Sequence, residues 1–405
     1  MAKKRNISVP EFVALLALVM SMIALSIDAM LPALGEIATS LGVTDENRSQ
    51  HIVSTIFLGM SFGVLFFGPF SDSFGRKKAI YLGVGFFLLG SVISLLAQEY
   101  EQMLFGRILQ GFGGSSCRIV SLAMIRDRFS GNEMARITSL IMMIFVLVPA
   151  LAPVIGQLIL SLAHWRWIFV LFIAIGLLII VWMYLRQEET LSMSNRREFS
   201  FKIIFEGARE TIKHHLSLSY TVMAGLSFGA FIGYLSSSRQ ILQVQYGLGE
   251  WFPLSFAVLA LAIGCSSFLN SRLVMKFSML RLVIFAQAYI LSISGTLLFF
   301  LNVGFEPNIY QLMLALIMIF FGIGVLIGNL NAMAVEPLGH IAGIANSVIA
   351  SIQTFVSVCI GAYIGSRYDG TVLPLISGFF LCSLPSLAVL LLISRPLHQV
   401  QQKEI

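Results

Sequence analysis

Charged residues are scarce in this chain. Only 11% of its 405 residues are Asp, Glu, Lys or Arg, and 57% are hydrophobic, whereas about a quarter of the residues of a soluble domain are charged. This composition excludes an ordinary soluble protein. Apolar stretches of about 20 residues, the length that crosses a bilayer as a helix, recur along the sequence. We therefore expect an integral membrane protein.

Residues that support metal binding or catalysis are also rare. The six histidines form no cluster with metal-ligand spacing, and no Walker motif or nucleophile–base pair falls in the apolar stretches. The sequence therefore predicts no enzyme, no metal and no cofactor, and it lacks the large soluble domain of a typical receptor. The four cysteines have no C-x-x-C spacing and are predicted to be small buried residues: Cys117, Cys265, Cys359 and Cys382.

The apolar stretches predict twelve spans in an all-α fold. One connection, residues 186–215, is long and polar and separates six spans from six. We predict an N-terminal half over 1–185, a cytoplasmic linker over 186–215 and a C-terminal half over 216–405. Within the linker, residues 199–213 have the apolar spacing of an amphipathic surface helix. The predicted spans are 11–34, 52–70, 79–97, 102–124, 136–161, 166–185, 216–237, 251–271, 281–301, 310–332, 341–363 and 372–394.

The net charge of +6 comes from bases spread over many short connections, which does not suit a nucleic-acid binder. With these spans, 20 of the 26 Lys and Arg residues lie on one side of the membrane. Positive charge is enriched on the cytoplasmic side, so both termini are predicted to be cytoplasmic in a bacterial cytoplasmic membrane. The opposite side holds only Arg48, Arg166, Arg239 and Arg367.

Three charged side chains fall within predicted spans and away from their ends, where charge is costly and mostly functional. They are Asp28 in the first span and Arg107 and Arg118 in the fourth. At about 1.5 Å per residue, Asp28 and Arg107 both lie about 9 Å to the outer side of the membrane centre, and Arg118 about 8 Å to the inner side. Asp28 and Arg107 are therefore predicted to lie at one depth, where they could pair.

Two interpretations of Asp28 and Arg107 stay open. A carboxyl that is neutral with its proton and ionised when it faces an arginine would couple transport to protons. The alternative is a static ion pair that stabilises the bundle. For Arg118, attraction of anionic or polar substrate groups competes with snorkelling of the side chain to the cytoplasmic rim.

Residues 68–78 read G-P-F-S-D-S-F-G-R-K-K between two apolar stretches. We expect the glycines and the proline to break the helix and to form a tight hairpin on the cytoplasmic surface. The positive end of span eleven, which starts near residue 341, is a suitable partner for Asp72. In the alternative interpretation, the bases of the turn only determine topology. A second segment, 270–281, keeps the bases without the acid or the glycines, as in transporters built from two related halves.

This turn closely resembles the signature loop of the major facilitator superfamily, G-x-L-[AS]-D-x-x-G-R-[RK]-[RK], with Phe70 in the leucine position. The stretch R-I-L-Q-G-F-G-G from Arg107 resembles R-x-x-Q-G-x-G-[AG] of that superfamily. Segments 28–34, 165–169 and 337–345 resemble its branch of bicyclomycin- and chloramphenicol-resistance drug/proton antiporters. The resemblance covers nearly the whole chain and implies twelve helices in two pseudo-symmetric six-helix halves.

The resemblance also implies roles for residues. Arg107 would take part in proton coupling, and Asp72 would hold the outward-facing gate through contacts with bases and the start of span eleven. One departure is residues 152–157, which read A-P-V-I-G-Q where antiporters of this superfamily often have G-P-x-x-G-G. This leaves import open beside export. The gate motif implied by the resemblance comprises Gly68, Asp72, Gly75 and Arg76.

These features predict a proton-coupled efflux antiporter of small amphipathic compounds or drugs, working by alternating access and conferring antibiotic resistance. The alternative is an exporter or importer of one metabolite or siderophore with the same fold, and Arg118 favours an anionic solute. The expected partners are the small-molecule substrate, protons and membrane lipid, with no nucleic acid, and this fold can work as a monomer. Polar residues in the spans are predicted to line the substrate cavity: Arg118, Gln157, Tyr234, Asn331 and Gln353.

Overall fold

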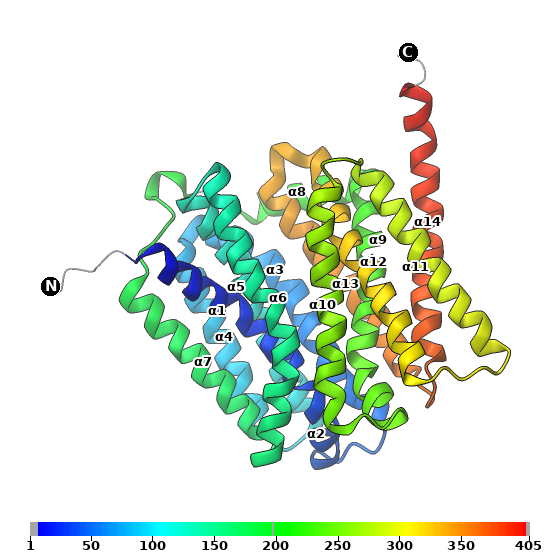
Figure 1. Ribbon diagram of the computed structural model, residues 1–405. Coiled ribbons are helices and arrows are strands. Elements are labelled where there is room, and N and C mark those ends of the chain that lie inside the picture. The colour runs from blue at the N-terminus through cyan, green and yellow to red at the C-terminus, as the bar shows by residue number, and fades with distance from the viewer. Residues whose placement is uncertain (1–6, 197, 402–405) are drawn as a thin grey trace. The chain divides into compact units, whose positions relative to one another are not determined.

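The computed structural model describes residues 7–196 and 198–401, and over these residues it contains helices and no strand (Figure 1). The predicted all-α class is confirmed. A helix pairs its backbone polar groups internally, as the interior of a bilayer requires. The α-helices are α1 Val9–Asp28, α2 Leu34–Ser40, α3 His51–Phe74, α4 Arg76–Leu96, α5 Tyr100–Arg128, α6 Gly131–Leu162, α7 Arg166–Arg186, α8 Phe201–Lys213, α9 His215–Arg239, α10 Phe252–Leu273, α11 Met279–Asn302, α12 Ile309–Val335, α13 Ala342–Ser366 and α14 Leu373–Gln401.

Eleven helical stretches of the described residues are long and apolar enough to cross a membrane. One of them, Ile309–Ser366, is 58 residues long and contains both α12 and α13. These helices are separated by the 3-10 segment η6, Glu336–Ile341, in which Leu338 has non-helical dihedral angles. Counted separately, they bring the number of spans to the predicted twelve. The two chain termini, residues 1–6 and 402–405, lie outside the described residues. Most of the terminal bases belong to these two segments.

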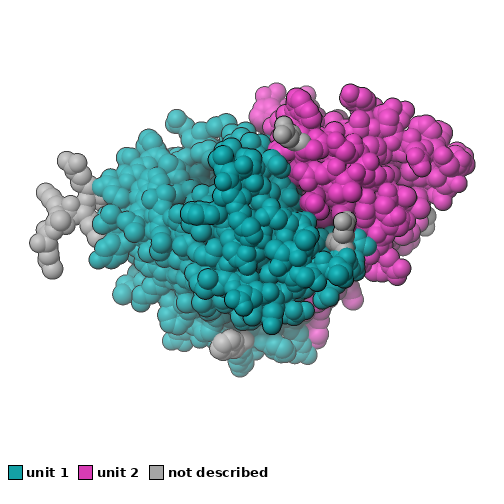
Figure 2. Space-filling view, turned by 90° about the horizontal axis from the view of Figure 1, so that it is seen from below, with its two compact units in different colours: residues 1–209, 343–351 teal, residues 210–342, 352–405 magenta. Residues whose placement is uncertain are grey.

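Contacts divide the chain into two compact units, coloured separately in Figure 2. Unit 1 comprises Met1–Arg209 and Gly343–Ser351, and unit 2 comprises Glu210–Ala342 and Ile352–Ile405. The first turns of α13 therefore belong to unit 1 and its remainder to unit 2. The predicted halves over 1–185 and 216–405, with a linker over 186–215, stay a prediction.

In unit 1, α3 and α5 pack closely through glycines. A Cβ atom on Gly111 of α5 would lie 1.8 Å from the carbonyl oxygen of Ile56 in α3, and one on Gly59 of α3 would lie 2.0 Å from that of Ile108 in α5. Both distances are far shorter than van der Waals contact. Only a residue without a side chain lets two membrane helices approach this closely.

In unit 2, buried amides and aromatic rings join the helices. Asn270 of α10 and Asn329 of α12 exchange side-chain hydrogen bonds of 3.3 and 2.9 Å. Tyr234 of α9 is 1% exposed, and its ring packs edge-on against Phe320 of α12 at a centroid distance of 4.9 Å. Phe256 of α10 stacks on the same tyrosine at 6.0 Å. Tyr234 is therefore part of the aromatic core of this unit.

The predicted amphipathic helix of the linker is confirmed as α8, Phe201–Lys213. Thr211 is buried, and a Cβ atom on Gly207 would lie 2.6 Å from the Cγ2 of Ile344. Phe205 and Ile212, which point away from Gly207 and Thr211, are exposed. The helix is thus covered along one side only.

Two of the four predicted buried cysteines are exposed. Cys117 and Cys382 are buried, whereas Cys265 and Cys359 are not, and all four are free thiols. The prediction is wrong for the second pair because the lipid-facing side of a membrane helix is as apolar as its packed side. An apolar sequence neighbourhood therefore does not distinguish the two environments.

Candidate functional site

Asp28 is the last residue of α1, and its side chain is buried, with 5% of its surface exposed. The helix ends there because Pro32 lacks an N–H group and its ring would clash with the carbonyl of the residue four positions earlier, which is Asp28. The chain continues through a 3-10 turn, Leu31–Ala33, into α2. The predicted span 11–34 is thus interrupted near its outer end, directly after the carboxylate of Asp28.

The Asp28 carboxyl makes no hydrogen bond or ion pair with any other residue in the part of the chain that the structure describes. Two features of its position oppose a negative charge. Burial removes the water that would solvate a carboxylate, and the C-terminal end of a helix carries a partial negative charge. The site therefore suits a neutral, protonated carboxyl.

Arg107 of α5 is fully buried and binds three acceptors from three helices. Its Nη2 donates to the carbonyl oxygen of Ser26 in α1 (2.9 Å), its Nε to that of Ile52 in α3 (3.1 Å) and its Nη1 to Oε1 of Gln110 (2.7 Å). Gln110 in turn donates to Ser91 of α4 at 2.7 Å. This network ties α5 to the three helices around it.

Asp28 and Arg107 were expected at one depth, where they could pair, but no ion pair joins them among the described residues. The reason is the early end of α1. The carbonyl groups of the last helical turn lack partners within the helix, and a guanidinium satisfies one of them at Ser26. The two side chains lie beside the same helix end, where Arg107 is bound to the backbone and Asp28 pairs with none of the described residues.

A close contact with α6 also forms at this helix end. A Cβ atom on Gly156 of α6 would lie 2.0 Å from the carbonyl oxygen of Ala29, the residue after Asp28. This is the glycine retained in the segment that reads A-P-V-I-G-Q. Its role is to let the α6 backbone approach the end of α1, and this role needs neither of the two motif positions that the chain has lost.

The turn between α3 and α4 is tighter than predicted. Helix α3 continues through Gly68 and Pro69 to Phe74, so the predicted helix break at these residues is wrong. A proline inside a membrane helix costs one backbone hydrogen bond and is tolerated. The chain reverses at Gly75, whose φ of +102° favours glycine, and α4 starts at Arg76.

Arg76 links this turn to the end of α5. Its buried guanidinium donates to the Asp72 carboxylate, to Oγ of Ser71 (2.9 Å) and to Oδ2 of Asp127 (2.9 Å). Thr190, beyond α7, also donates to Asp127, at 3.1 Å. Two of the predicted gate residues, Asp72 and Arg76, are therefore directly paired, with Asp127 as a second acid on the same guanidinium.

The sequence identified neither Asp127 nor a second functional acid, Glu189. One of its carboxylate oxygens accepts from the backbone N of Arg76 (2.9 Å) and the other from that of Lys77 (3.1 Å). The backbone N–H groups of Thr190 and Leu191 donate to the same carboxylate at 3.0 and 3.1 Å. It satisfies the first N–H groups of α4 as an N-cap does, but from a distant segment.

Signals for both missed acids were present in the sequence but were ambiguous. Asp127 stands between two bases at the end of a span, and Glu189 follows Glu188 in the linker. Only the fold selects Glu189 over Glu188, because it brings the former next to Gly75. A Cβ atom on Gly75 would lie 2.5 Å from Oε2 of Glu189, so a side chain there would displace this carboxylate, in addition to straining the backbone at a φ of +102°.

Replacing Glu189 should loosen the linker. In Glu189→Ala, four backbone N–H groups lose their acceptor, and we expect a loss of about 1–2 kcal/mol of stability, the size of a lost helix cap. Limited trypsin digestion should cleave the 186–215 segment several-fold faster than in the unchanged protein. Glu188→Ala, which removes an exposed neighbouring carboxylate, is the matched control. Equal cleavage rates in the two variants would contradict the proposed role.

The first turns of α13, which belong to unit 1, contact α3 beside this motif. A Cβ atom on Gly68 would lie 2.3 Å from Oγ of Ser347, and Ser351 donates to the carbonyl oxygen of Ser61 at 2.7 Å. Asp72 itself makes no hydrogen bond to α13 within the described ranges. The contact between the gate motif and span eleven is thus made by Gly68, and the acid pairs with Arg76.

The five predicted cavity residues are divided between the units. Arg118 and Gln157 are in unit 1, where Arg118 is exposed in the middle of α5 and makes no ion pair with a described residue. In unit 2, Gln353 is 8% exposed and Oδ1 of Asn331 is buried without a hydrogen-bond partner among the described residues. Tyr234 belongs to the aromatic core described above. Their shared role in binding substrate stays a prediction.

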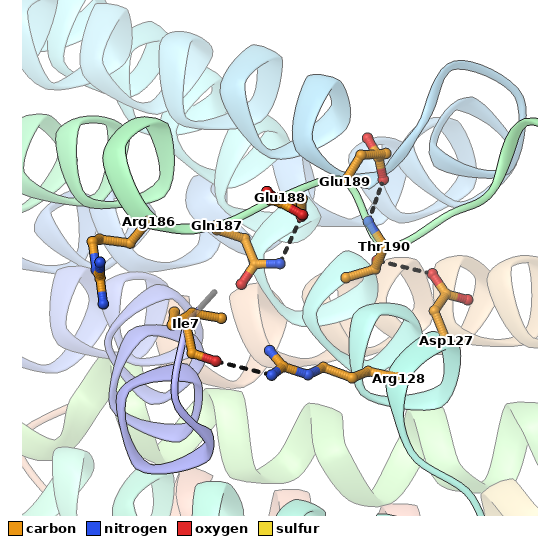
Figure 3. A pocket seen from close by; sticks show the side chains of 8 residues that line it. All are labelled: Ile7, Asp127, Arg128, Arg186, Gln187, Glu188, Glu189 and Thr190. Carbon is orange, nitrogen blue, oxygen red and sulfur yellow. Dashed lines mark hydrogen bonds between the residues drawn. The ribbon is translucent and has the colours of Figure 1, made fainter. Parts of the chain in front are cut away.

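A cavity of about 290 Å³ lies on another part of unit 1, next to the end of α5 and the start of the linker (Figure 3). At its edge, Arg128 donates to the carbonyl oxygen of Ile7 at 3.0 Å. None of the predicted substrate residues lines it. Within the described ranges, no three His, Cys, Asp or Glu side chains are placed to hold a metal ion. The lining residues are Ile7, Asp127, Arg128, Arg186, Gln187, Glu188, Glu189 and Thr190.

Residues 15–362 match the family model described as Major Facilitator Superfamily. The "Bicyclomycin resistance protein homolog" of Haemophilus influenzae is 32% identical over 401 residues, which cover 95% of this chain and 97% of that protein. The "Multidrug resistance protein MdtL" of Shewanella oneidensis is 28% identical over 335 residues, 82% of each chain. Both are similar to this chain over most of their length.

Two solved structures share the fold. The human organic anion transporter MFSD10 superposes with a TM-score of 0.66 at 17% identity, covering 96% of this chain and 99% of that one. A D-xylose–proton symporter superposes with a TM-score of 0.67 at 14% identity, covering 93% and 97%. At this level of identity the likeness concerns the fold alone, and it confirms the predicted fold class.

Proposed function

Because the chain belongs to the Major Facilitator Superfamily, we propose that it is a proton-coupled transporter that exports small amphipathic compounds by alternating access. It acts by transport and not by catalysis, as a single chain in the bacterial cytoplasmic membrane with both termini in the cytoplasm. The distribution of Lys and Arg over the connections supports this orientation. The names of the bicyclomycin- and multidrug-resistance relatives support drugs as the cargo and export as its direction.

The observation that carries proton coupling is the buried carboxyl of Asp28, which pairs with no residue that the structure describes. In this proposal Asp28 holds a proton in the state described here. Arg107 is bound to the carbonyl of Ser26, only two residues away along α1. A small movement that turns its guanidinium from this carbonyl to the carboxyl would stabilise the ionised form and release the proton.

The turn around Gly75 serves as the cytoplasmic gate in the same proposal. The Arg76 guanidinium holds α3, α4 and α5 together through Asp72 and Asp127. The approach of Gly68 to Ser347 gives this assembly a direct contact with α13. Opening would separate the first turns of α13 from α3, which are joined by the hydrogen bond from Ser351 to Ser61 and by the close approach of Gly68 to Ser347.

An exporter or importer of one specific metabolite or siderophore is the second candidate. Arg118 favours it, because an exposed guanidinium in the middle of a membrane-spanning helix would attract an anionic solute. We place Arg118 with Gln157, Tyr234, Asn331 and Gln353 among the residues that select the substrate. An inward flux of anionic solutes and no outward flux of drugs would favour this candidate.

Transport by the purified full chain in proteoliposomes tests the main proposal. With an imposed pH gradient, a lipophilic cationic dye should move against its own gradient, in exchange for protons. Each proton exchanged under a gradient of one pH unit supports a concentration ratio of about tenfold. Collapse of the gradient by a protonophore should abolish the accumulation. Dye movement that does not respond to the pH gradient would refute proton coupling.

A further inference from the structure

A groove of about 420 Å³ lies between α4 and α7, on a part of unit 1 that the proposed transport function does not use. It is lined by aliphatic and aromatic side chains only. Three of these side chains are more than half exposed: Val181, Tyr184 and Leu185. The groove is therefore open to the surroundings of the protein. The lining residues are Tyr81, Ile180, Val181, Tyr184 and Leu185.

The groove lies at one end of its helices. Tyr81 is in the second turn of α4, which starts at Arg76, and Leu185 is the penultimate residue of α7, which ends at Arg186. These ends carry the bases that are predicted to face the cytoplasm. Tyrosines gather where the apolar part of a bilayer meets its headgroups. The groove is thus expected at the boundary between acyl chains and headgroups of the inner leaflet.

One base near the groove is available to a ligand. Lys77 donates to the carbonyl oxygen of Gln187, and Nε and Nη2 of Arg186 each donate to the carboxylate of Glu11 at 2.6 Å. Lys78 is exposed and makes no ion pair with a described residue. It precedes Tyr81 by three residues, which places both on one side of α4. The cation therefore stands at the headgroup end of the groove.

We propose that this groove binds an anionic phospholipid of the cytoplasmic leaflet. An acyl chain lies against Val181 and Leu185, and the phosphate of the headgroup lies near Lys78. Basic sites between membrane helices on the cytoplasmic side are suited to anionic headgroups. The nearby acid Glu189 does not compete for Lys78, because its carboxylate accepts four backbone hydrogen bonds. The inference does not depend on which compound the protein carries.

Native mass spectrometry of the delipidated full chain tests this proposal. The protein is mixed with equal amounts of phosphatidylglycerol and phosphatidylcholine that have identical acyl chains, and the lipids bound per protein are counted. We expect phosphatidylglycerol to be retained in preference. Lys78→Gln should lower its retention about fivefold, the size expected for one base at a membrane surface. Leu185→Trp, which fills the groove, should lower the retention of both lipids.

Matched controls use residues of the same type and exposure. Lys276→Gln changes another exposed lysine of a short connection, and Leu314→Trp enlarges a leucine that is 59% exposed, close to the 58% of Leu185. Both should bind lipid as the unchanged protein does. The proposal fails if the unchanged protein binds the two lipids equally. It also fails if Lys78→Gln and Leu185→Trp reduce binding no more than their controls.

Discussion

Asp28→Asn is expected to abolish the response of transport to a pH gradient. Asparagine has nearly the same shape as the acid and is neutral, so the variant should keep the packing of a protonated Asp28 but cannot release a proton. In proteoliposomes under a gradient of one pH unit, accumulation of the dye should fall by about tenfold for each proton exchanged. Movement of the dye down its own gradient should continue.

Asp369→Asn is the matched control for this experiment. Asp369 is an exposed acid in the connection before α14, where its carboxylate accepts from the backbone N and the hydroxyl of Thr371. Its neutralisation should leave the response to pH unchanged. If Asp28→Asn responds to the gradient as the unchanged protein does, Asp28 is not the coupling site. A failure of the unchanged protein to respond would instead reject proton coupling as a whole.

Gly111→Ala is expected to cause the largest loss of stability from adding a single methyl group. The new Cβ atom would lie 1.8 Å from the carbonyl oxygen of Ile56 and 2.7 Å from the carbonyl carbon of the same residue. Both are backbone atoms, so a whole helix must move to make room. Overpacking of this kind costs about 1–3 kcal/mol, and more where no rotamer change relieves it. The midpoint of thermal unfolding in detergent should fall clearly.

Gly328→Ala provides the comparison within a helix of the same kind. A Cβ atom on Gly328 of α12 would meet nothing within 4 Å, so the added methyl group creates no clash. Alanine is also the better helix former, and the variant should be unchanged or more stable by up to about 1 kcal/mol. Similar unfolding midpoints for the two variants would show that the close crossing of α3 and α5 does not contribute to stability as described.

The relation between Asp28 and Arg107 shows how far depth along a helix predicts contact. The number of residues from the centre of each predicted span placed Asp28 and Arg107 at the same depth. In the structure both side chains lie beside the end of α1. The count did not show that Pro32 ends α1 at Asp28 and thereby leaves the Ser26 carbonyl without a partner. Arg107 bonds to that carbonyl. Which of several nearby acceptors a guanidinium binds depends on the local path of the backbone.

The turn between α3 and α4 likewise combines contacts that the sequence predicted with contacts that only the fold shows. Its composition identified Gly75, Asp72 and Arg76 as a unit, and the residues are indeed joined at this turn. Asp127 and Glu189, which bind the side chain and the backbone of Arg76, were not identified, because they lie 51 and 113 positions away from it in the sequence. Such distant acids are indistinguishable in sequence from other charged residues near the ends of spans.

Hydrophobicity alone determined that this protein is a bundle of membrane-spanning helices, because a bilayer accepts long apolar segments only as structures that pair their own backbone. The motif 68–78 determined its family, because short turns between spans keep a local pattern of glycine, acid and bases. Only the tertiary structure decided which polar groups meet. Arg107 binds the end of α1, Glu189 caps α4, and Asp28 pairs with no residue in the described part of the chain. Hydrogen bonds depend on ångström distances between segments that the chain brings together only when it folds.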